Sequence, residues 1–372
     1  MTLSKSFFKV MNSNISHKTF SYNGAEAATA LCGDQMHCII TPSAGLKFKD
    51  QVAAACEAAG HLAEYFQMVP IFKRYFLSDI ANQAALLPQE EQCAVSVIQQ
   101  PALCGSKVVV WIVMERDADF TLQADGVWTD SKGRIIQGDS AVSGSDSAEE
   151  TRVYLNRFSE ALKVRGGNLA DHCLRTWFMV HDVDRNYAGV VRGRNEVFAA
   201  EGLKEHFIAS TGIGGSPAGS LVAFNAVADL SVKPEQVTFI KGATHLNPTI
   251  EYGVAFERAT AVDYPDFRKV YVSGTASIDN KGQVVAVGDI ERQTERMIEN
   301  IEVLLREAEC ELTDVMHLLV YLRDIADYEA VDAIFEYRLP GVPRVLLLAP
   351  VCRPQWLVET ECIAIRRKNE AR

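Results

Sequence analysis

Hydrophobic and polar positions in the last third of the chain form a regular succession of strand-like and helix-like segments. Short apolar or alternating runs predict strands, and the NKG at 280–282 is typical of a hairpin turn. Between them, apolar residues recur at helical spacing with charges on the opposite face. The predicted strands lie at 269–278, 284–288, 315–322, 344–351 and 356–365, and the predicted helices at 289–308 and 328–337. The order is β-β-α-β-α-β with one further closing strand.

The same order of elements is predicted in the middle third and, less completely, in the first third. The middle third has a hairpin with SKG at its turn, then a helix, a strand, a helix and a closing strand. The first third contains a strand, an Ala-rich helix, a strand, a short helix and two closing strands. We therefore predict three repeats, at 1–117, 118–235 and 250–372, the first of them degenerate.

One short turn supports this division because it occurs once in each predicted repeat. The segments 76–86, 180–191 and 322–331 each end an apolar run in Asp and then begin a helix. Self-similarity at such a long period indicates repeated domains and not a solenoid of short repeats.

Each predicted repeat offers a sheet with two helices on one face, so its other face must be buried. Three such sheets can bury these faces against one another around a common axis. The pattern therefore predicts an α+β fold in which three repeats form an intrachain pseudo-trimer. Such a chain contains the three units that a homotrimer of single repeats would bring together. We therefore expect a monomer or homodimer and not a homotrimer.

Composition narrows the classes of partner. The 372 residues are 48% hydrophobic and 23% charged, which is typical of a globular protein. A net charge of −11 without a long basic run argues against nucleic acid as a partner. Nine Cys without a CxxC pair indicate reduced thiols and a cytoplasmic location. The longest apolar run, at 108–114, is too short to span a membrane. The eight His show no metal-ligand spacing, and we expect neither metal nor organic cofactor.

The closing strands of the third repeat carry the most informative charges. Arg344 opens one strand, and Glu359 and Glu361 lie two apart on the next, so both carboxylates face the same side. Two carboxylates on an apolar strand are costly unless they are paired or solvated, and a wet edge strand explains them equally well. The second repeat has Ala223 and Asn225 at the two Glu positions. This asymmetry predicts a single active site.

Further candidates come from the second repeat and from the segment before the last strand. The Gly-rich run at 211–220 lacks the Lys and the strand–loop–helix setting of a nucleotide-binding loop, although its N–H groups could cradle a carboxylate. Arg194 and Tyr187 lie on a predicted helix, where solvation and packing are the simpler interpretations. Cys352 is close to Glu359 along the sheet, but a buried inert thiol is the usual case.

Residues 255–367 resemble the RidA/YjgF family, which has a chorismate-mutase-like fold. The matching features are VSGTASID at 272–279, the helix with Gln293 and Asn300, VYLRDIADY at 320–328, and Pro343-Arg344 followed by VETECIAI. The resemblance implies that Arg344 and Glu359 line a cleft between repeats. Simple members of that family hydrolyse 2-imino acids.

The longer chain is similar to the chorismatases of the FkbO and Hyg type. The similarity rests on VCRPQWLVETE at 351–361, VSGTAS at 272–277, GR at 193–194 and STGIGG at 210–215. It implies cleavage of chorismate with loss of pyruvate, to a dihydroxycyclohexadiene carboxylate or a hydroxybenzoate. Cys352 lies seven residues before Glu359, as in the hydroxybenzoate-forming members, whereas Ala276 departs from the Gly expected beside it.

We therefore predict a chorismatase-like enzyme with Glu359 as general acid. The alternatives are a RidA-type imine deaminase and a non-catalytic protein that binds a small carboxylate. The predicted catalytic residues are Glu359, Arg344 and Cys352, and the predicted substrate-binding residues are Arg194, Tyr187, Thr211, Gly212, Gly274, Ala276 and Glu361.

Overall fold

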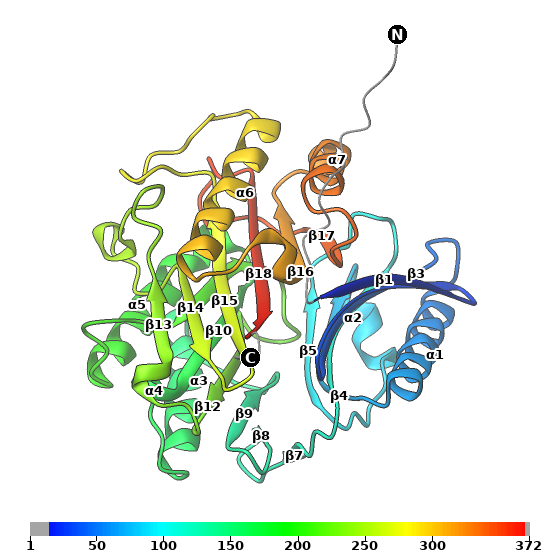
Figure 1. The fold of residues 1–372 in the computed structure, drawn as a ribbon, viewed down its shortest axis with the longest axis horizontal. Coiled ribbons are helices and arrows are strands. Elements are labelled where there is room, and N and C mark those ends of the chain that lie inside the picture. The colour runs from blue at the N-terminus through cyan, green and yellow to red at the C-terminus, as the bar shows by residue number, and fades with distance from the viewer. Residues whose placement is uncertain (1–14, 369–372) are drawn as a thin grey trace.

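Three six-stranded sheets, each from one third of the chain, make up the protein (Figure 1). The computed structural model describes residues 15–368. Each unit contributes six strands, which we count along the chain. Across every sheet these strands lie side by side in the order first, second, third, sixth, fourth, fifth. Only the fourth and fifth strands of each sheet pair in parallel. The predicted α+β pseudo-trimer is thereby confirmed.

The first unit is more complete than its sequence suggested. Its six strands include an N-terminal hairpin that the hydrophobic pattern did not reveal, and its second helix is a short α-helix followed by a 3-10 turn. The elements are β1 (Ser16–Tyr22), β2 (Ala25–Cys32), β3 (Gln35–Pro42), α1 (Phe48–Phe66), β4 (Val69–Leu77), α2 (Ile80–Gln83), η1 (Ala84–Leu86), β5 (Ala94–Gln99) and β6 (Val108–Glu115).

The second unit has two long helices that lie against its sheet. Asp146 caps the first of them by accepting a hydrogen bond from the Glu149 N–H. The elements are β7 (Thr121–Leu122), β8 (Trp128–Thr129), β9 (Arg134–Gln137), α3 (Ser147–Lys163), α4 (Leu169–His172), β10 (Cys173–Val180), α5 (Val183–Ala200), β11 (Ala209–Gly214) and β12 (Val222–Asp229).

The first strand of the third unit begins at Val237, which is earlier than the expected boundary at 250. Its elements are η2 (Pro234–Gln236), β13 (Val237–Ile240), η3 (Thr249–Tyr252), β14 (Ala259–Asp263), β15 (Phe267–Ala276), α6 (Ile290–Glu307), η4 (Leu312–Asp314), β16 (Val315–Leu322), η5 (Ile325–Asp327), α7 (Tyr328–Arg338), β17 (Arg344–Leu348) and β18 (Val358–Arg367).

One predicted strand of this unit, at 284–288, is wrong. The segment makes a single bridge, Ile278 with Val284, and β14 takes the place beside β15 instead. Val287 is 63% exposed, and Ala286 has a φ of 58°, which ends any extended run. Apolar residues alone therefore did not make a strand where nothing paired with them.

The turn that recurs in the sequence recurs in the structure. Asp79, Asp182 and Asp324 are the N-cap residues of α2, α5 and η5. Asp79 and Asp324 accept backbone hydrogen bonds with their side chains, as an N-cap does to satisfy the first free N–H groups.

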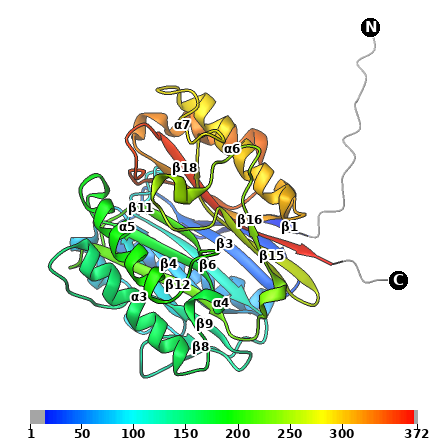
Figure 2. The ribbon, with the colours of Figure 1, turned by 90° about the vertical axis from the view of Figure 1, so that its left-hand side faces the viewer.

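The sheets meet in the middle of the molecule, and the helices cover the outside (Figure 2). One core cluster joins residues of all three units, among them Trp111, Trp177 and Tyr321. Isolated bridges connect the edges of neighbouring sheets: Gln99 with Ser216, Ala102 with Leu347, and Ile213 with Val351. All three bridges lie on or just after the fifth strand of a sheet, β5, β11 or β17, so these edges of the three units converge.

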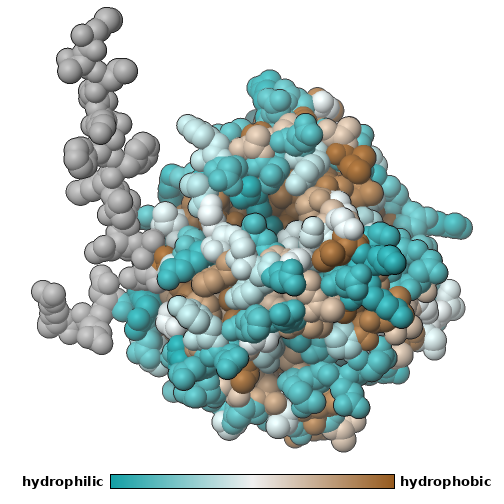
Figure 3. All heavy atoms as spheres, turned by 90° about the vertical axis from the view of Figure 1, so that its right-hand side faces the viewer, coloured by the Kyte–Doolittle hydropathy of each residue, from teal (hydrophilic) through white to brown (hydrophobic). Residues whose placement is uncertain are grey.

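The outer surface gives no sign of a membrane-spanning element. Within residues 15–368, no helix combines the length and the apolar character needed to cross a bilayer. On the face shown in Figure 3, hydrophobic side chains are scattered among hydrophilic ones. All nine Cys are free thiols.

Candidate active site

Glu359 on β18 lines a pocket between the second and third units. The residue is 4% exposed. Burial raises the pKa of Glu359 to about 8, and the nearby carboxylate of Glu361 adds to this effect, while Arg175 and Arg258 oppose it. At pH 7 the protonated form of the carboxyl group is therefore favoured. A neutral acid that faces a pocket can donate a proton.

The neighbouring strand β15 makes room for this carboxyl group. A Cβ atom on Gly274 would lie 2.0 Å from Oε1 of Glu359, so no larger residue fits there without moving the acid. Ala276 pairs directly with Glu359 in the sheet and also lines the pocket. The Oγ1 of Thr211 accepts hydrogen bonds from the Gly274 N–H, at 2.9 Å, and from Arg175. Thr211 thus holds β11 against β15.

Three arginines line the same pocket. Arg194 comes from α5 and is 1% exposed, Arg258 precedes β14 and is 5% exposed, and Arg353 lies on the loop between β17 and β18. Arg258 donates to the backbone oxygen of Asn247 at 3.0 Å. Glu359 is the one acidic residue among the lining residues that the structure describes. With this acid neutral, the pocket is strongly positive and suits an anion with more than one carboxylate.

Tyr187 and Cys352 close one side of the pocket. The Tyr187 ring packs on Gly212, where a Cβ atom would lie 2.6 Å from the ring. The Tyr187 hydroxyl and the Cys352 thiol lie close enough to affect each other's pKa. Burial raises the pKa of Cys352 to about 12 and the pKa of Tyr187 well above its usual value. Both groups are therefore neutral at pH 7, and Cys352 is not poised as a thiolate nucleophile.

The loop at 349–357 covers the pocket and is tied down at both ends. The Gly214 N–H donates to the Pro350 oxygen at 2.9 Å, and the Leu357 N–H donates to Oε1 of Gln293 at 3.0 Å. Between these ties, the Arg353 guanidinium lies 5.3 Å from the centre of the Trp356 ring. The free space inside is about 30 Å³, room for one water molecule. A larger ligand can enter only if this loop opens.

Arg344 does not lie in this pocket, which corrects its expected placement beside Glu359. Its guanidinium pairs with Asp332 at 2.8 Å and with Glu336 at 2.9 Å. It lines a different cavity, between the third and first units, together with Glu26 and other residues of the first unit.

The reason is the position of the two strands in the sheet. Strand β16 separates β17 from β18, and β17 is the edge that contacts the first unit, whereas β15 faces the second. The β17 edge and the interior strand β15 of this sheet therefore line two different clefts. In the second unit, Ser210 occupies the sheet position that Arg344 occupies in the third unit. It is this Ser210 that lines the Glu359 pocket.

Glu361 also lies outside the pocket, contrary to its expected role in substrate binding. It faces the pseudo-threefold axis, where Arg175 contacts it at 2.6 Å and the Trp177 indole N–H donates to it at 2.6 Å. Both Glu361 and Arg175 are buried. The carboxylate thus satisfies a buried arginine and helps to keep Glu359 protonated.

The structure brings together most of the residues expected at the site and adds others, among them Arg258, Arg353 and Trp356. Arg353 and Trp356 lie inside the segment 351–361 that resembles the chorismatases, so this signal could have found them. Arg258 lies outside every motif, and only the packing of the third unit against the second places it there. The expected residues that line the pocket are Glu359, Cys352, Arg194, Tyr187, Gly212, Gly274 and Ala276.

Known structures and sequences agree with this architecture. The solved structure of a chorismatase matches with a TM-score of 0.66 and 19% identity, over 79% of this chain and 92% of that chain. At this identity the likeness is one of fold, and its coverage extends beyond two units. In architecture this is a chorismatase-like protein of the RidA/YjgF superfamily, as the sequence predicted.

The third unit carries the sequence likeness. The family model of endoribonuclease L-PSP matches residues 259–366. A RutC family protein of Pyrococcus abyssi is 35% identical over 99 residues, which are 26% of this chain and 78% of that protein. The 3-aminoacrylate deaminase RutC of Acinetobacter baylyi is 34% identical over 97 residues, 26% of this chain and 77% of that protein. The chain belongs to the endoribonuclease L-PSP family.

Proposed function

We propose that this protein is a chorismatase-like enzyme that cleaves the enolpyruvyl ether of chorismate and releases pyruvate. The observation that carries the proposal is a buried, protonated Glu359 in a pocket with Arg194 and Arg258. Chorismate has two carboxylates, which arginine forks bind well, and an enol ether, which acid attacks at carbon. The fold shared with a chorismatase supports the same substrate class.

In the proposed reaction, Glu359 gives its proton to the methylene carbon of the enolpyruvyl group. The electron pair of the double bond forms the new C–H bond, and an oxocarbenium ion remains at the ether carbon. The Glu359 carboxylate left behind balances this cation. Water can then add to the cation and release pyruvate and a diol. Alternatively, the ring hydroxyl adds to the cation and gives its proton to the Glu359 carboxylate, which yields a cyclic ketal. Loss of a ring proton with cleavage of one ring C–O bond makes the ring aromatic, and the resulting hemiketal collapses to pyruvate and a hydroxybenzoate.

Substrate entry requires movement of the loop at 349–357, because the pocket holds about 30 Å³ of free space in this conformation. The tip at Arg353 and Pro354 is exposed and lies outside the strands. A substrate carboxylate that binds Arg353 would replace its contact with Trp356 and hold the closed loop over the ring. Closure would also exclude bulk water from the cation.

Two alternatives fit the site less well. A RidA-type imine deaminase would need Arg344 as its carboxylate anchor, but this arginine pairs with Asp332 and Glu336 in another cleft. A non-catalytic binding protein would not need a buried acid beside its ligand that can give up its proton.

The decisive assay is incubation of the purified protein with chorismate. We expect equimolar pyruvate and a single ring product, identified by mass, at a rate that falls strongly in Glu359→Gln. Release of ammonia from 2-imino acids without chorismate turnover would favour the deaminase. Binding of chorismate without release of pyruvate would overturn the enzymatic proposal in favour of a binding protein.

A further inference from the structure

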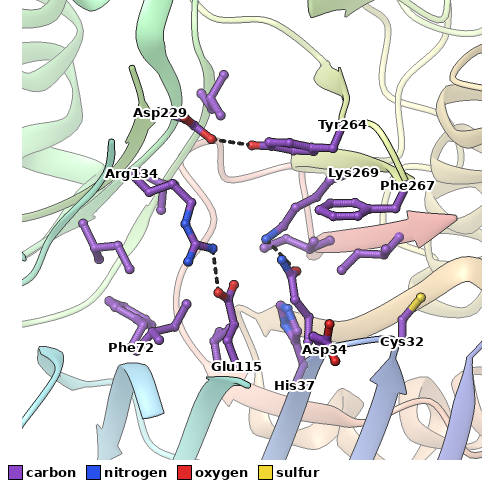
Figure 4. Close-up of a pocket in the computed structure, with 18 of the residues that line it drawn as sticks. Cys32, Asp34, His37, Phe72, Glu115, Arg134, Asp229, Tyr264, Phe267 and Lys269 are labelled. Atoms are coloured by element: carbon purple, nitrogen blue, oxygen red, sulfur yellow. Dashed lines mark hydrogen bonds and ion pairs between the residues drawn. The ribbon is translucent and has the colours of Figure 1, made fainter. Parts of the chain in front are cut away.

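A second and larger cavity, of about 440 Å³, lies on the pseudo-threefold axis. All three units line it, chiefly through the ends of β6, β12 and β18 and the strands paired with them. It shares no lining residue with the pocket of Glu359. Figure 4 shows side chains of β3, β6, β9 and β15 converging on it. Its volume is within the range of small-molecule sites.

The cavity wall carries a ring of three equivalent positions, one from each unit. Gln35 pairs with Glu115 in the first sheet, Arg134 with Asp229 in the second, and Lys269 with Ile365 in the third. The third unit therefore has an apolar residue where the other two have an acid. Lys269 thus has no acidic partner across its own sheet, although the carboxylates of Glu115 and Asp229 act on it from the other two units.

The contacts around the ring confirm this asymmetry. The Arg134 guanidinium pairs with Glu115 at 2.6 Å, and Asp229 accepts a hydrogen bond from the Tyr264 hydroxyl at 3.0 Å (Figure 4). Lys269 is 9% exposed and donates to the neutral Oε1 of Gln35 at 3.1 Å. Within residues 15–368, no carboxylate lies within 4.0 Å of its ammonium group.

Aromatic side chains form the floor of the cavity, with a second buried cation behind them. Phe72, Trp111 and Trp177 line the cavity, and the guanidinium of Arg74 lies 5.2 to 5.5 Å from the centres of these rings. Arg74 is 1% exposed, and it donates to the amide oxygen of Asn225 at 2.9 Å. Among the described residues, no carboxylate is within ion-pairing distance of it either. Neither cation therefore has a carboxylate in direct contact among the described residues. Burial of a cation without such a contact is costly, and a bound anion would offset part of that cost.

We propose that the axial cavity is a binding site for a small aromatic carboxylate. The carboxylate binds Lys269 in the wall, and the ring lies against Phe72, Trp111 and Trp177 on the floor. Stacked or edge-on aromatic contacts and a buried charge-assisted hydrogen bond recognise the two halves of such a ligand. The proposal is independent of the proposed reaction, because it uses none of the residues of the Glu359 pocket.

Benzoate is the probe, and the indole N–H resonances of the four Trp residues report its position in the full-length protein. Benzoate in the axial cavity shifts the resonances of Trp111 and Trp177, whereas benzoate in the arginine pocket shifts that of Trp356. We expect the first pattern, with one molecule bound per chain. Two results would overturn the proposal: resonance shifts confined to Trp356, or no shift of any Trp resonance at about 10 mM benzoate. This concentration is on the order of the weakest specific affinities.

Two variants and one control complete the test. Lys269→Met removes the charge at nearly constant volume and should weaken benzoate binding about 10- to 100-fold. Val227→Phe, at a half-buried position of the wall, should block the cavity with Lys269 intact. The same Lys→Met change at the exposed Lys281 should leave binding unchanged. Benzoate affinity equal to wild type in both Lys269→Met and Val227→Phe would show that the anion binds elsewhere.

Discussion

Replacing Glu359 with Gln should stabilise the fold while it removes the proposed chemistry. In the folded protein the pKa of this carboxyl is raised from 4.5 to about 8, mainly by burial. Between these two values the unfolded chain releases the proton and the folded protein keeps it. The free energy of unfolding therefore falls as the pH rises, by about 5 kcal/mol in total at pH 8 and above.

The Gln side chain has nearly the shape of the protonated acid and does not titrate. The Glu359→Gln variant should therefore exceed the wild type in stability by about 1 kcal/mol at pH 5 and about 3 kcal/mol at pH 7. Urea unfolding at a series of pH values measures this difference. A difference that does not grow with pH would refute the reasoning that burial keeps this acid protonated.

Glu361→Gln is the matched control, because it makes the same change two residues away on the same strand. Glu361 contacts the buried Arg175 at 2.6 Å, so loss of its charge leaves a guanidinium uncompensated. Breaking a buried pair in this way costs about 3–5 kcal/mol. The two substitutions should therefore change stability in opposite directions.

Turnover provides the second measurement on the same variant. Loss of a general acid typically costs about 10²–10⁴-fold in rate, so Glu359→Gln should release pyruvate from chorismate that much more slowly. The wild-type rate should itself fall as the pH rises through about 8, since the protonated form disappears there. Unchanged turnover in the variant would remove Glu359 from the mechanism.

Four further outcomes follow from the site and the fold. Arg258→Lys keeps the charge but loses the planar fork. It should lower kcat/KM for chorismate about 10- to 100-fold. Arg344→Lys makes the same change in the other cleft and should leave kcat/KM unchanged. Gly274→Ala should displace the acid and abolish turnover, because its Cβ atom would lie 2.0 Å from Oε1, while Gly45→Ala, with no atom within 4 Å, should have no effect. Cys352→Ala should shift products toward the non-aromatic diol if the thiol keeps water from the ring, and an unchanged product ratio would make it a space-filling group. Light scattering should give the 41.0 kDa chain or its dimer, and a stable species of three chains, 123 kDa, would contradict the assembly.

The repeated architecture could be predicted from the sequence because it depends on local patterns. Apolar runs, helical spacing and the three Asp turns each act over a few residues, and each is visible without knowledge of the fold. The prediction failed where a strand needed a distant partner. The apolar segment at 284–288 found none, and the N-terminal hairpin pairs through alternating residues that carry only a weak hydrophobic signal.

The sequence by itself also determined which acid is unusual, since Glu359 stands where the other two repeats have Ala223 and Val109. Only the tertiary structure decided which residues surround it. Arg344 is close to Glu359 in the chain but serves a different cleft, because β17 lies against the first unit while β15, beside the strand of Glu359, lies against the second. Arg258 joins the site for the same reason. The protonation of Glu359 is likewise a property of the assembled fold, because burial arises only when the second unit covers the third.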